Sequence, residues 1–408
     1  MSLVAISLLI MIVITNRYFA GKFGSMLLGK NFDPKIEGYE PTVDVVIPMY
    51  NEGKGIQGTM LSMLSQNYPA EKLSVTVVDD CSTDDSLFWA RKAAALHPER
   101  ANVIKNKVNV GKRIGIAHAV RRSKAEIIVS VDSDVVVHPD AVRHLVARFV
   151  SDDIAAVGGR VNVSNPNENW LTKMQTIKYH FGYGFLKSLE RVFRTVMCLS
   201  GCLTAYRRSV LLELEPILEN RNLLGVPIKY GEDRFLTRQI VKAGYRTVLT
   251  MEANCWTIAP ATLPKYFSQQ LRWRRSNFID YMAGVTHVWK LNPFVALHYC
   301  ALFALQFTYP VVVLSHILAG TFWPLASFHI VVLLFLGVLY RWQVRALPEE
   351  QKVSPWSFAA MGVVMPVTYL VLNALALWTL DSGSWETRGH VAPVRVAEAE
   401  AEGELSSV

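Results

Sequence analysis

The stretch EIIVSVDSD, residues 126 to 134, decides the fold, because an apolar run typical of a buried strand stops at two carboxylates. Runs of the same kind lie at VDVVIP (43–48), LSVTVVDD (73–80) and IAAVGGRVNV (154–163). Helical patterns separate them, at 56–66, 84–96 and 111–120. This alternation predicts an α/β domain with a mostly parallel sheet and helices on both faces.

Polar and acidic side chains stand at the carboxyl ends of three of these strands. Ligands of open parallel sheets bind beyond those ends. Clustered carboxylates repel one another unless a cation or a donor-rich ligand lies among them, although single acids at strand ends are also common helix caps. We interpret the group as a binding site, and its members are Tyr50, Glu52, Asp79, Asp80, Asp132 and Asp134.

A positively charged helix start follows in NVGKR, residues 109 to 113. Lys112 and Arg113 would lie where a diphosphate meets a helix N-terminus, and a divalent ion held by one or two carboxylates would share the diphosphate oxygens. A solvated helix start is the alternative. The sequence has neither G-x-x-x-x-G-K-[ST] nor G-x-G-x-x-G, which argues against P-loop ATPases and dinucleotide enzymes.

Two further motifs carry candidate chemistry downstream. In GEDR (231–234), Glu232 and Asp233 precede a helical pattern, so one of them is either a general base or a helix cap. The segment QQLRW (269–273) places Gln269, Arg272 and Trp273 in a Q-x-x-R-W pattern. The alternative for that segment is an amphipathic interfacial helix, whose arginines, including Arg274 and Arg275, meet lipid headgroups.

Apolar segments predict an integral membrane protein. Residues 295–318, 322–340 and 356–380 are each long enough to span a bilayer, and an uncharged run at 2–14 is marginal. Basic residues follow that first run, which favours an uncleaved anchor with a cytosolic continuation. The net charge of +8 fits anionic lipid and an anionic substrate, and no nucleic-acid motif accompanies it. Five cysteines in a mainly cytosolic chain suggest free thiols.

Six motifs, VVDDCSTD, NVGKR, VDSD, GEDR, QQLRW and SWETR, occur in this order between about residues 43 and 388. With them the chain resembles processive family 2 glycosyltransferases, above all hyaluronan synthases and rhizobial chitin-oligosaccharide synthases. The resemblance implies a cytosolic GT-A domain that uses a UDP-sugar and Mn²⁺ or Mg²⁺. It also marks a departure, since Gly201 and Cys202 stand where the family usually reads G-P, in a segment that lies by the acceptor in relatives.

The resemblance further implies a role for each motif residue. Asp233 would be the catalytic base with Glu232 beside it, and Asp132 and Asp134 the nucleotide and metal pair. Trp273 would stack on the acceptor sugar while Arg272 reaches the diphosphate and Gln269 bonds nearby. The uridine would be held by Tyr50, Asp79 and Asp80, with Glu52 beside them and Lys112 on the diphosphate. Trp385, Thr387 and Arg388 would close over the nucleotide, with Glu386 in place of the family's glycine.

These readings predict an order of domains: an anchor (1–20), the GT-A domain (41–260), interfacial helices (261–292), a membrane channel region (293–380) and a C-terminal tail (381–408). We expect a multi-pass plasma-membrane enzyme that extends and translocates a β-linked polysaccharide from UDP-N-acetylglucosamine, with or without UDP-glucuronate. The alternatives are a chitin, poly-N-acetylglucosamine, cellulose or capsule-type synthase, and an inactive export scaffold. Three full spans would put Arg388 outside the cell, so we favour a re-entrant path for 356–380, bent near Gly362 and Pro366.

Overall fold

The structure is a computed structural model, and it describes residues 23, 26–27, 33–223, 225–228, 230–349 and 352–381. The predicted anchor at 1–20 and nearly all of the tail lie outside the described residues. The described chain divides into two compact units. The sheet unit holds residues 33–161 and 194–257, and the helical unit holds 162–193 and 258–381. Residues 162–193 therefore pack with the apolar helices, although they fall inside the segment predicted as GT-A domain.

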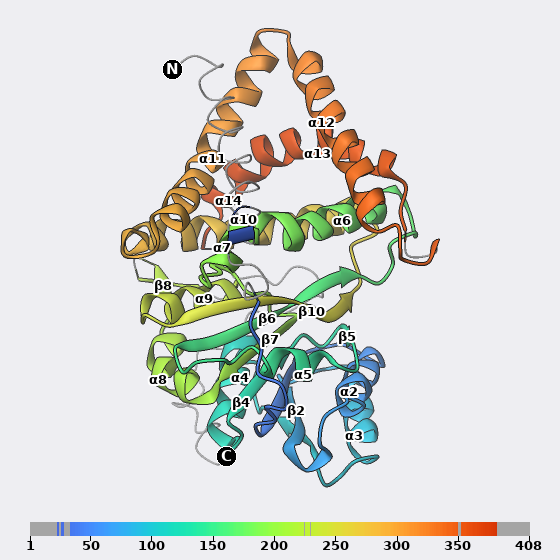
Figure 1. The fold of residues 1–408 in the computed structure, drawn as a ribbon, viewed down its shortest axis with the longest axis vertical. Coiled ribbons are helices and arrows are strands. Elements are labelled where there is room, and N and C mark those ends of the chain that lie inside the picture. Colours follow the sequence, from blue (N-terminus) through green and yellow to red (C-terminus); the bar gives the residue numbers. More distant parts are fainter. Residues whose placement is uncertain are drawn as a thin grey trace. The chain divides into compact units, whose positions relative to one another are not determined.

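The sheet unit is built on an eight-stranded sheet in the order β3-β2-β1-β4-β7-β6-β10-β5 (Figure 1). Strands β3, β2, β1 and β4 pair in parallel, whereas β7 is antiparallel to β4 and β6, and β5 is antiparallel to β10. The predicted α/β class is confirmed. The strand bounds are β1 Val43–Met49, β2 Leu73–Asp79, β3 Ala101–Lys105, β4 Ile127–Val131, β5 Val135–Val137, β6 Ile154–Val163, β7 Leu203–Arg207 and β10 Arg246–Thr257, and a separate pair joins β8 Asn222–Leu223 to β9 Val226–Pro227.

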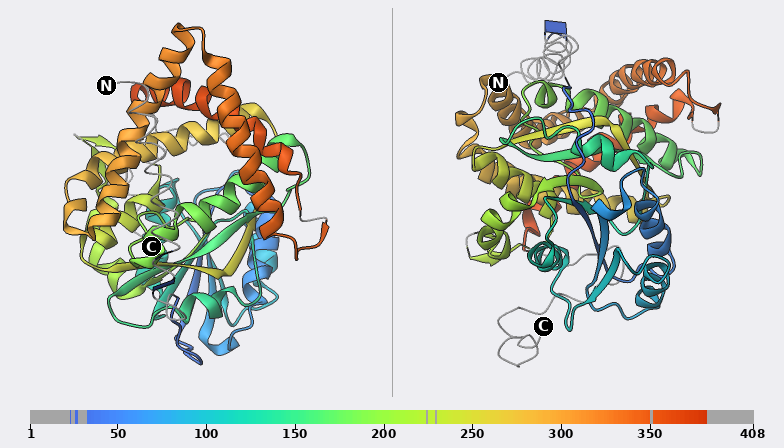
Figure 2. Two further views of the ribbon diagram at one scale, coloured as in Figure 1. Left: turned by 45° about the horizontal axis from the view of Figure 1, so that its top comes forward. Right: turned by 60° about the horizontal axis from the view of Figure 1, so that its bottom comes forward.

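Helices cover both faces of this sheet, with α2 and α3 on one face and α4 and α8 on the other (Figure 2). This arrangement follows from the right-handed crossover rule. The chain moves in one direction across the sheet from β1 through β2 to β3, so the crossover helices α2 and α3 lie on one face. It moves back in the opposite direction from β3 to β4, so α4 lies on the other face. Every residue of β1 and β4 is buried, as the continuous apolar runs predict. The helix bounds are α2 Gly55–Leu64, α3 Ser86–Ala94, α4 Lys112–Arg122, α5 Ala141–Val146, α8 Arg208–Glu219 and α9 Glu232–Lys242.

The helical unit contains three segments long and apolar enough to cross a membrane, at Pro293–Leu318, Phe322–Gln343 and Pro355–Trp378. They match the three predicted spans after the catalytic domain to within a few residues. The first two are the single helices α11 and α12, and the third is a succession of short pieces. The other elements are α6 Trp170–Phe181, η3 Gly182–Leu186, α7 Ser188–Val192, α10 Leu263–Val285 and η4 Val288–Lys290.

The third apolar segment starts beside α6 and ends beside α10. Its pieces are η6 Pro355–Ala360, α13 Met361–Val367, η7 Thr368–Leu372 and α14 Asn373–Trp378. Phe358 of η6 packs 6.1 Å from Phe181 of α6, between ring centroids, and at the other end Thr379 Oγ1 accepts a hydrogen bond of 2.9 Å from Arg275 of α10. Between these ends the segment rises along α12, where Gly362 lies against Ile330, and returns past α11 (Figure 1).

Buried polar groups hold this return path in place. Arg274 of α10 is 9% exposed, and its guanidinium donates to Asn373 Oδ1, to Gln306 Oε1 at 3.4 Å and to Thr368 Oγ1 at 3.5 Å. The same guanidinium lies 4.0 Å from the ring centroid of Tyr369. The expectation that Arg274 and Arg275 meet lipid headgroups is therefore wrong, because both are buried against the last apolar segment. A buried cation needs such fixed acceptors, since it has lost its water.

Candidate active site

The carboxyl ends of β1, β2 and β4 meet at one edge of the sheet. Asp80 N donates to the carbonyl of Met49 at 2.8 Å, which ties the end of β2 to the end of β1. Ser133, between the two aspartates that follow β4, donates from Oγ to Glu52 Oε1 at 2.5 Å. Tyr50 follows β1 directly and is half-buried. The residues that the sequence places at the three strand ends thus line one edge.

Asp79 and Asp80 have different surroundings although both are buried. The Asp80 carboxylate accepts hydrogen bonds from Asn106 Nδ2 (3.0 Å), Val110 N (2.9 Å) and Gly111 N (2.7 Å), so it holds the loop that leads into α4. Burial raises the pKa of Asp80, and these hydrogen bonds favour its charged form. Gly111 caps α4 at φ 85°, a conformation that favours glycine.

Asp79 has a free oxygen by contrast. Its Oδ1 accepts from Ser82 N at 3.1 Å, while the buried Oδ2 has no hydrogen-bond partner among the residues that the structure describes. A buried acceptor without a donor is costly. This oxygen is therefore suited to a ligand N–H.

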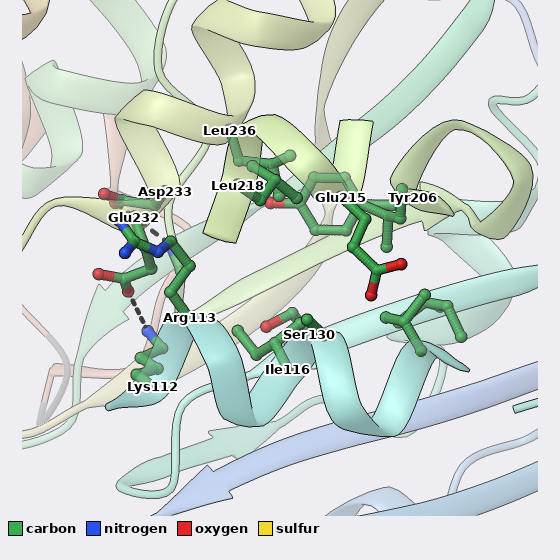
Figure 3. Close-up of a pocket in the computed structure, with 15 residues that line it drawn as sticks. Lys112, Arg113, Ile116, Ser130, Tyr206, Glu215, Leu218, Glu232, Asp233 and Leu236 are labelled. Carbon is green, nitrogen blue, oxygen red and sulfur yellow. Dashed lines mark hydrogen bonds and ion pairs between the residues drawn. The ribbon is translucent and has the colours of Figure 1, made fainter. Parts of the chain in front are cut away.

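Lys112 joins the two acidic motifs of the sheet unit. Its Nζ lies 2.6 Å from Asp132 Oδ1. It also lies 2.5 Å from Glu232 Oε1, the ion pair drawn in Figure 3. Burial by itself lowers the pKa of Lys112, but these two carboxylates hold it well above its ordinary value, so the ammonium stays charged. Residues 112, 132 and 232, far apart in the sequence, thus form one ionic cluster. Arg113, the other predicted cation of this helix start, instead donates to the carbonyl of Ile228 at 3.1 Å.

Asp233 stands next to this cluster in the first turn of α9. Gly231, at φ 68°, takes the cap position of the helix. Asp233 Oδ1 accepts from Arg234 N at 2.8 Å, and Oδ2 accepts from Gly201 N at 3.4 Å. Burial, and next the negative charge of Glu232, raise the pKa of Asp233, while Lys112 opposes them. A carboxylate with a raised pKa accepts a proton more readily, which suits a general base.

Gly201 is a site residue that the sequence did not single out for this role. A β-carbon at this position would lie 2.9 Å from Lys112 Nζ, 3.5 Å from Asp132 Oδ1 and 3.6 Å from Glu232 Oε1. The ammonium therefore occupies the space that a side chain would need. Gly201 meets Lys112, Asp132 and Glu232 only in the folded chain, so no short sequence pattern around residue 201 predicts this role.

A small cavity opens beside the cluster, between α4, α8 and α9 (Figure 3). Lys112, Glu232 and Asp233 border one end, and the remaining wall is largely apolar with the carboxylate of Glu215 facing it. Its volume of about 40 Å³ holds roughly one or two water molecules and no sugar ring. Arg121 Nε lies 2.5 Å from Glu215 Oε1 and compensates its charge.

The residues at the β4 end fit a divalent cation as a partial ligand set. Asp132 and Asp134 are both half-buried, so each can be reached. No group of three His, Cys, Asp or Glu with metal-binding geometry occurs among the described residues. One or two carboxylates completed by phosphate oxygens are what Mg²⁺ and similar ions use in nucleotide sites. The donor set therefore suits an ion that arrives with a diphosphate.

The QQLRW motif lies in the helical unit, on α10. Gln269, Arg272 and Trp273 are half-buried there, and the Trp273 ring packs 6.4 Å from that of Tyr179, between centroids. These three residues thus belong to a different unit from the acidic cluster. The final motif residues, Trp385, Thr387 and Arg388, lie outside the described residues.

An α/β sheet with a D-x-D at one strand end, a lysine bridging it to a second acidic motif and a candidate base beside it defines a nucleotide-sugar glycosyltransferase with a GT-A-like fold. The chain belongs to glycosyltransferase family 2: residues 41–276 match the family described as glycosyltransferase like family 2. It is an enzyme, a UDP-sugar-dependent glycosyltransferase, and with its three apolar segments a membrane protein.

Named relatives agree with that assignment. The chain is 33% identical to an N-acetylglucosaminyltransferase of Mesorhizobium japonicum, over 87% of this chain and 84% of that one. It is also 33% identical to a hyaluronan synthase of Streptococcus pyogenes, over 70% and 68% of the two chains. A solved mannosyltransferase from Pyrobaculum calidifontis, in complex with GDP-Man and Mn²⁺, shares the fold at a TM-score of 0.59 and 21% identity, covering 91% of this chain and 99% of its own.

Proposed function

We propose that the protein is a processive, inverting polysaccharide synthase that adds UDP-activated sugars to a growing β-linked chain and passes it through the membrane. Its donor would be UDP-N-acetylglucosamine, alone or together with UDP-glucuronate. The observation that carries the proposal is the cluster at Lys112, which joins the D-x-D carboxylate Asp132 to Glu232, next to the half-buried Asp233. Donor-binding and proton-accepting groups are thereby adjacent.

In this mechanism Asp233 accepts the proton of the acceptor hydroxyl, which attacks the anomeric carbon as UDP leaves from the opposite face. The raised pKa of Asp233 supports the role, since a stronger base takes the proton more readily. Lys112 offsets the negative charge that builds on the diphosphate, a large contribution in such transfers. Inversion of an α-linked donor gives a β-linked product.

The remaining donor contacts would be made by polar groups at the sheet edge. The unpartnered Oδ2 of Asp79 suits the N–H of a uracil ring, and Tyr50, Glu52 and Asp80 lie beside it. Asp134 and Asp132 would hold Mn²⁺ or Mg²⁺, which when bound offsets diphosphate charge. Asp80 acts mainly through the loop that it holds against the start of α4.

The acceptor end of the proposal rests on α10. An indole stacks well on the apolar face of a sugar ring, so Trp273 is the platform for the growing chain, with Gln269 and Arg272 beside it. The third segment begins against α6 and ends against α10, and both helices lie outside the three apolar segments, which supports a re-entrant path. Residues 385, 387 and 388 would then remain on the cytosolic side together with the catalytic unit.

Two polar residues in the apolar segments bear on the translocation path. Gln306 and Asn373 are polar side chains that can either line such a path or bond between helices. Both contact Arg274, and Asn373 Nδ2 also donates to the carbonyl of Gln306 at 2.7 Å, which supports helix-to-helix bonding. His316, which is half-buried, bonds Thr321 across the end of α11, at 2.8 Å from its Nδ1.

The test is UDP release by the purified full-length protein in detergent with Mn²⁺ or Mg²⁺. UDP-N-acetylglucosamine and UDP-glucuronate are supplied singly and together, and the product is sized by gel electrophoresis. Turnover of the amino sugar alone with a long product supports a chitin-like homopolymer, and a requirement for both donors supports a hyaluronan-like copolymer. Single-residue transfer without elongation refutes processivity. No turnover with these donors or UDP-glucose supports the inactive scaffold.

A further inference from the structure

The helical unit contains a lysine without an acidic partner next to the proposed acceptor platform. Lys178 of α6 donates from Nζ to Gln270 Oε1 at 2.8 Å. The same nitrogen lies 5.6 Å from the ring centroids of both Tyr266 and Trp273. In the part of the chain that the structure describes, no carboxylate pairs with this ammonium, and only a neutral amide and two aromatic faces surround it.

A second unneutralised cation lies close by. Arg274 bonds the neutral oxygens of Asn373, Gln306 and Thr368 and, among the described residues, no carboxylate. Burial, and next the charge of Arg274, lower the pKa of Lys178 to about 7. The Lys178 ammonium is thus destabilised as the unit stands. An anion next to it would reverse that effect, because an opposite charge favours the charged form.

We propose that Lys178, Gln270 and Trp273 form an acceptor subsite for an acidic sugar, with the carboxylate of a hexuronate on Lys178 and its ring on the indole. The proposal rests on the proposed function, in which Trp273 carries the growing saccharide. Charge-assisted hydrogen bonds from an ammonium to a carboxylate are short and strong. A hexuronate ring supplies both groups that this site can bind: an apolar face that stacks on the indole of Trp273 and a carboxylate that pairs with the ammonium of Lys178.

The geometry favours a sugar carboxylate over a lipid phosphate. Two aromatic rings flank the ammonium at equal distance, and both Lys178 and Trp273 are half-buried, so each is accessible in part. A sugar carboxylate carries one substituent, whereas a tetrahedral phosphodiester carries two that need space. The Gln270 amide, already bonded to Nζ, is positioned to contact a neighbouring hydroxyl group.

The experiment measures binding of two hexasaccharides to the full-length protein in detergent at pH 6.5, by titration calorimetry. One alternates N-acetylglucosamine and glucuronate, and the other is a chitin hexasaccharide. We expect wild type to bind the acidic hexasaccharide about tenfold more tightly than the neutral one, a typical effect of a shielded ion pair. Lys178→Gln should abolish this preference, Lys178→Arg should keep it, and the matched control Lys173→Gln on the same helix should not change it.

Several results would overturn the proposal. Equal affinity of wild type for the two hexasaccharides, or an undiminished preference in Lys178→Gln, removes the acidic subsite. If neither hexasaccharide binds while UDP is still released, Trp273 is not the acceptor platform and the subsite falls with it. A preference for phosphatidylglycerol nanodiscs that Lys178→Gln loses, with saccharide binding unchanged, assigns Lys178 to lipid phosphate. UDP affinity and thermal unfolding confirm that each variant is folded.

Discussion

Replacing Gly201 by alanine tests whether the position of Lys112 controls catalysis. The added β-carbon would lie 2.9 Å from Lys112 Nζ, and ordinary contact begins at 3.4 Å, so the ammonium must move by about 0.5 Å. That movement takes Nζ away from the carboxylates that it now meets at 2.6 and 2.5 Å. The colliding atom is the end of a flexible side chain, so the backbone need not shift.

The expected loss follows from the strength of a charged hydrogen bond. Weakening one such bond costs about 1.5–3 kcal/mol, which lowers kcat/KM by roughly 10- to 100-fold if Lys112 acts on the diphosphate. The fold should tolerate the change, because Gly201 is not among the glycines with positive φ. A glycine-to-alanine change at such a position adds up to about 1 kcal/mol to the free energy of unfolding.

The assay is UDP release together with thermal unfolding of the purified protein. The matched control is Gly58→Ala in α2, where an added β-carbon meets no atom within 4 Å. We expect Gly201→Ala to lose turnover at an unchanged or raised unfolding temperature, and Gly58→Ala to keep wild-type turnover. Wild-type kcat/KM in Gly201→Ala would refute the role given to Lys112. A lowered unfolding temperature would instead show that the backbone moves, which contradicts the geometric reasoning.

Further predictions concern the base and the return path. Asp233→Asn should lower turnover by about 10²- to 10⁴-fold with UDP affinity kept, and retained polymer synthesis would remove Asp233 as the base. Asp233 must be ionised to act, so activity should fall as the pH drops through its raised pKa. Because the charge of Glu232 helps to raise that pKa, Glu232→Gln should move the acidic side of the pH–activity profile to lower pH. An unmoved profile would contradict the effect of Glu232 on Asp233. Arg274→Met should destabilise the protein by about 1–3 kcal/mol, because it leaves Asn373 Oδ1 without its donor. The exposed Arg345→Met serves as its control in thermal unfolding, and equal unfolding temperatures of the two variants would contradict a stabilising role of the Arg274 contacts.

Local sequence patterns predicted β1, β2 and β4 of the parallel half of the sheet because these strands are almost wholly buried. The fourth parallel strand, β3 (Ala101–Lys105), is partly exposed and was not predicted. The predicted stretch at 126–134 contains β4, the predicted strand at 154–163 coincides with β6, and α9 starts at Glu232, inside the GEDR motif. We assigned no strands beyond residue 163, so β7 and β10 were not anticipated. Strand β7 pairs with β4 across about 75 residues of chain, and no local periodicity encodes such a partner.

The sequence by itself determined the fold class, the apolar segments and the identity of the acids, since each depends on residue type and short spacing. Only the tertiary structure decided which groups meet. Lys112 bridges Asp132 and Glu232, and Gly201 is bare because the ammonium occupies its side-chain space. Arg274 reaches Asn373 across 99 residues, a contact that hydropathy does not encode. Hydropathy measures the preference of each residue for lipid or water, whereas such contacts depend on long-range packing that brings distant residues to a common point.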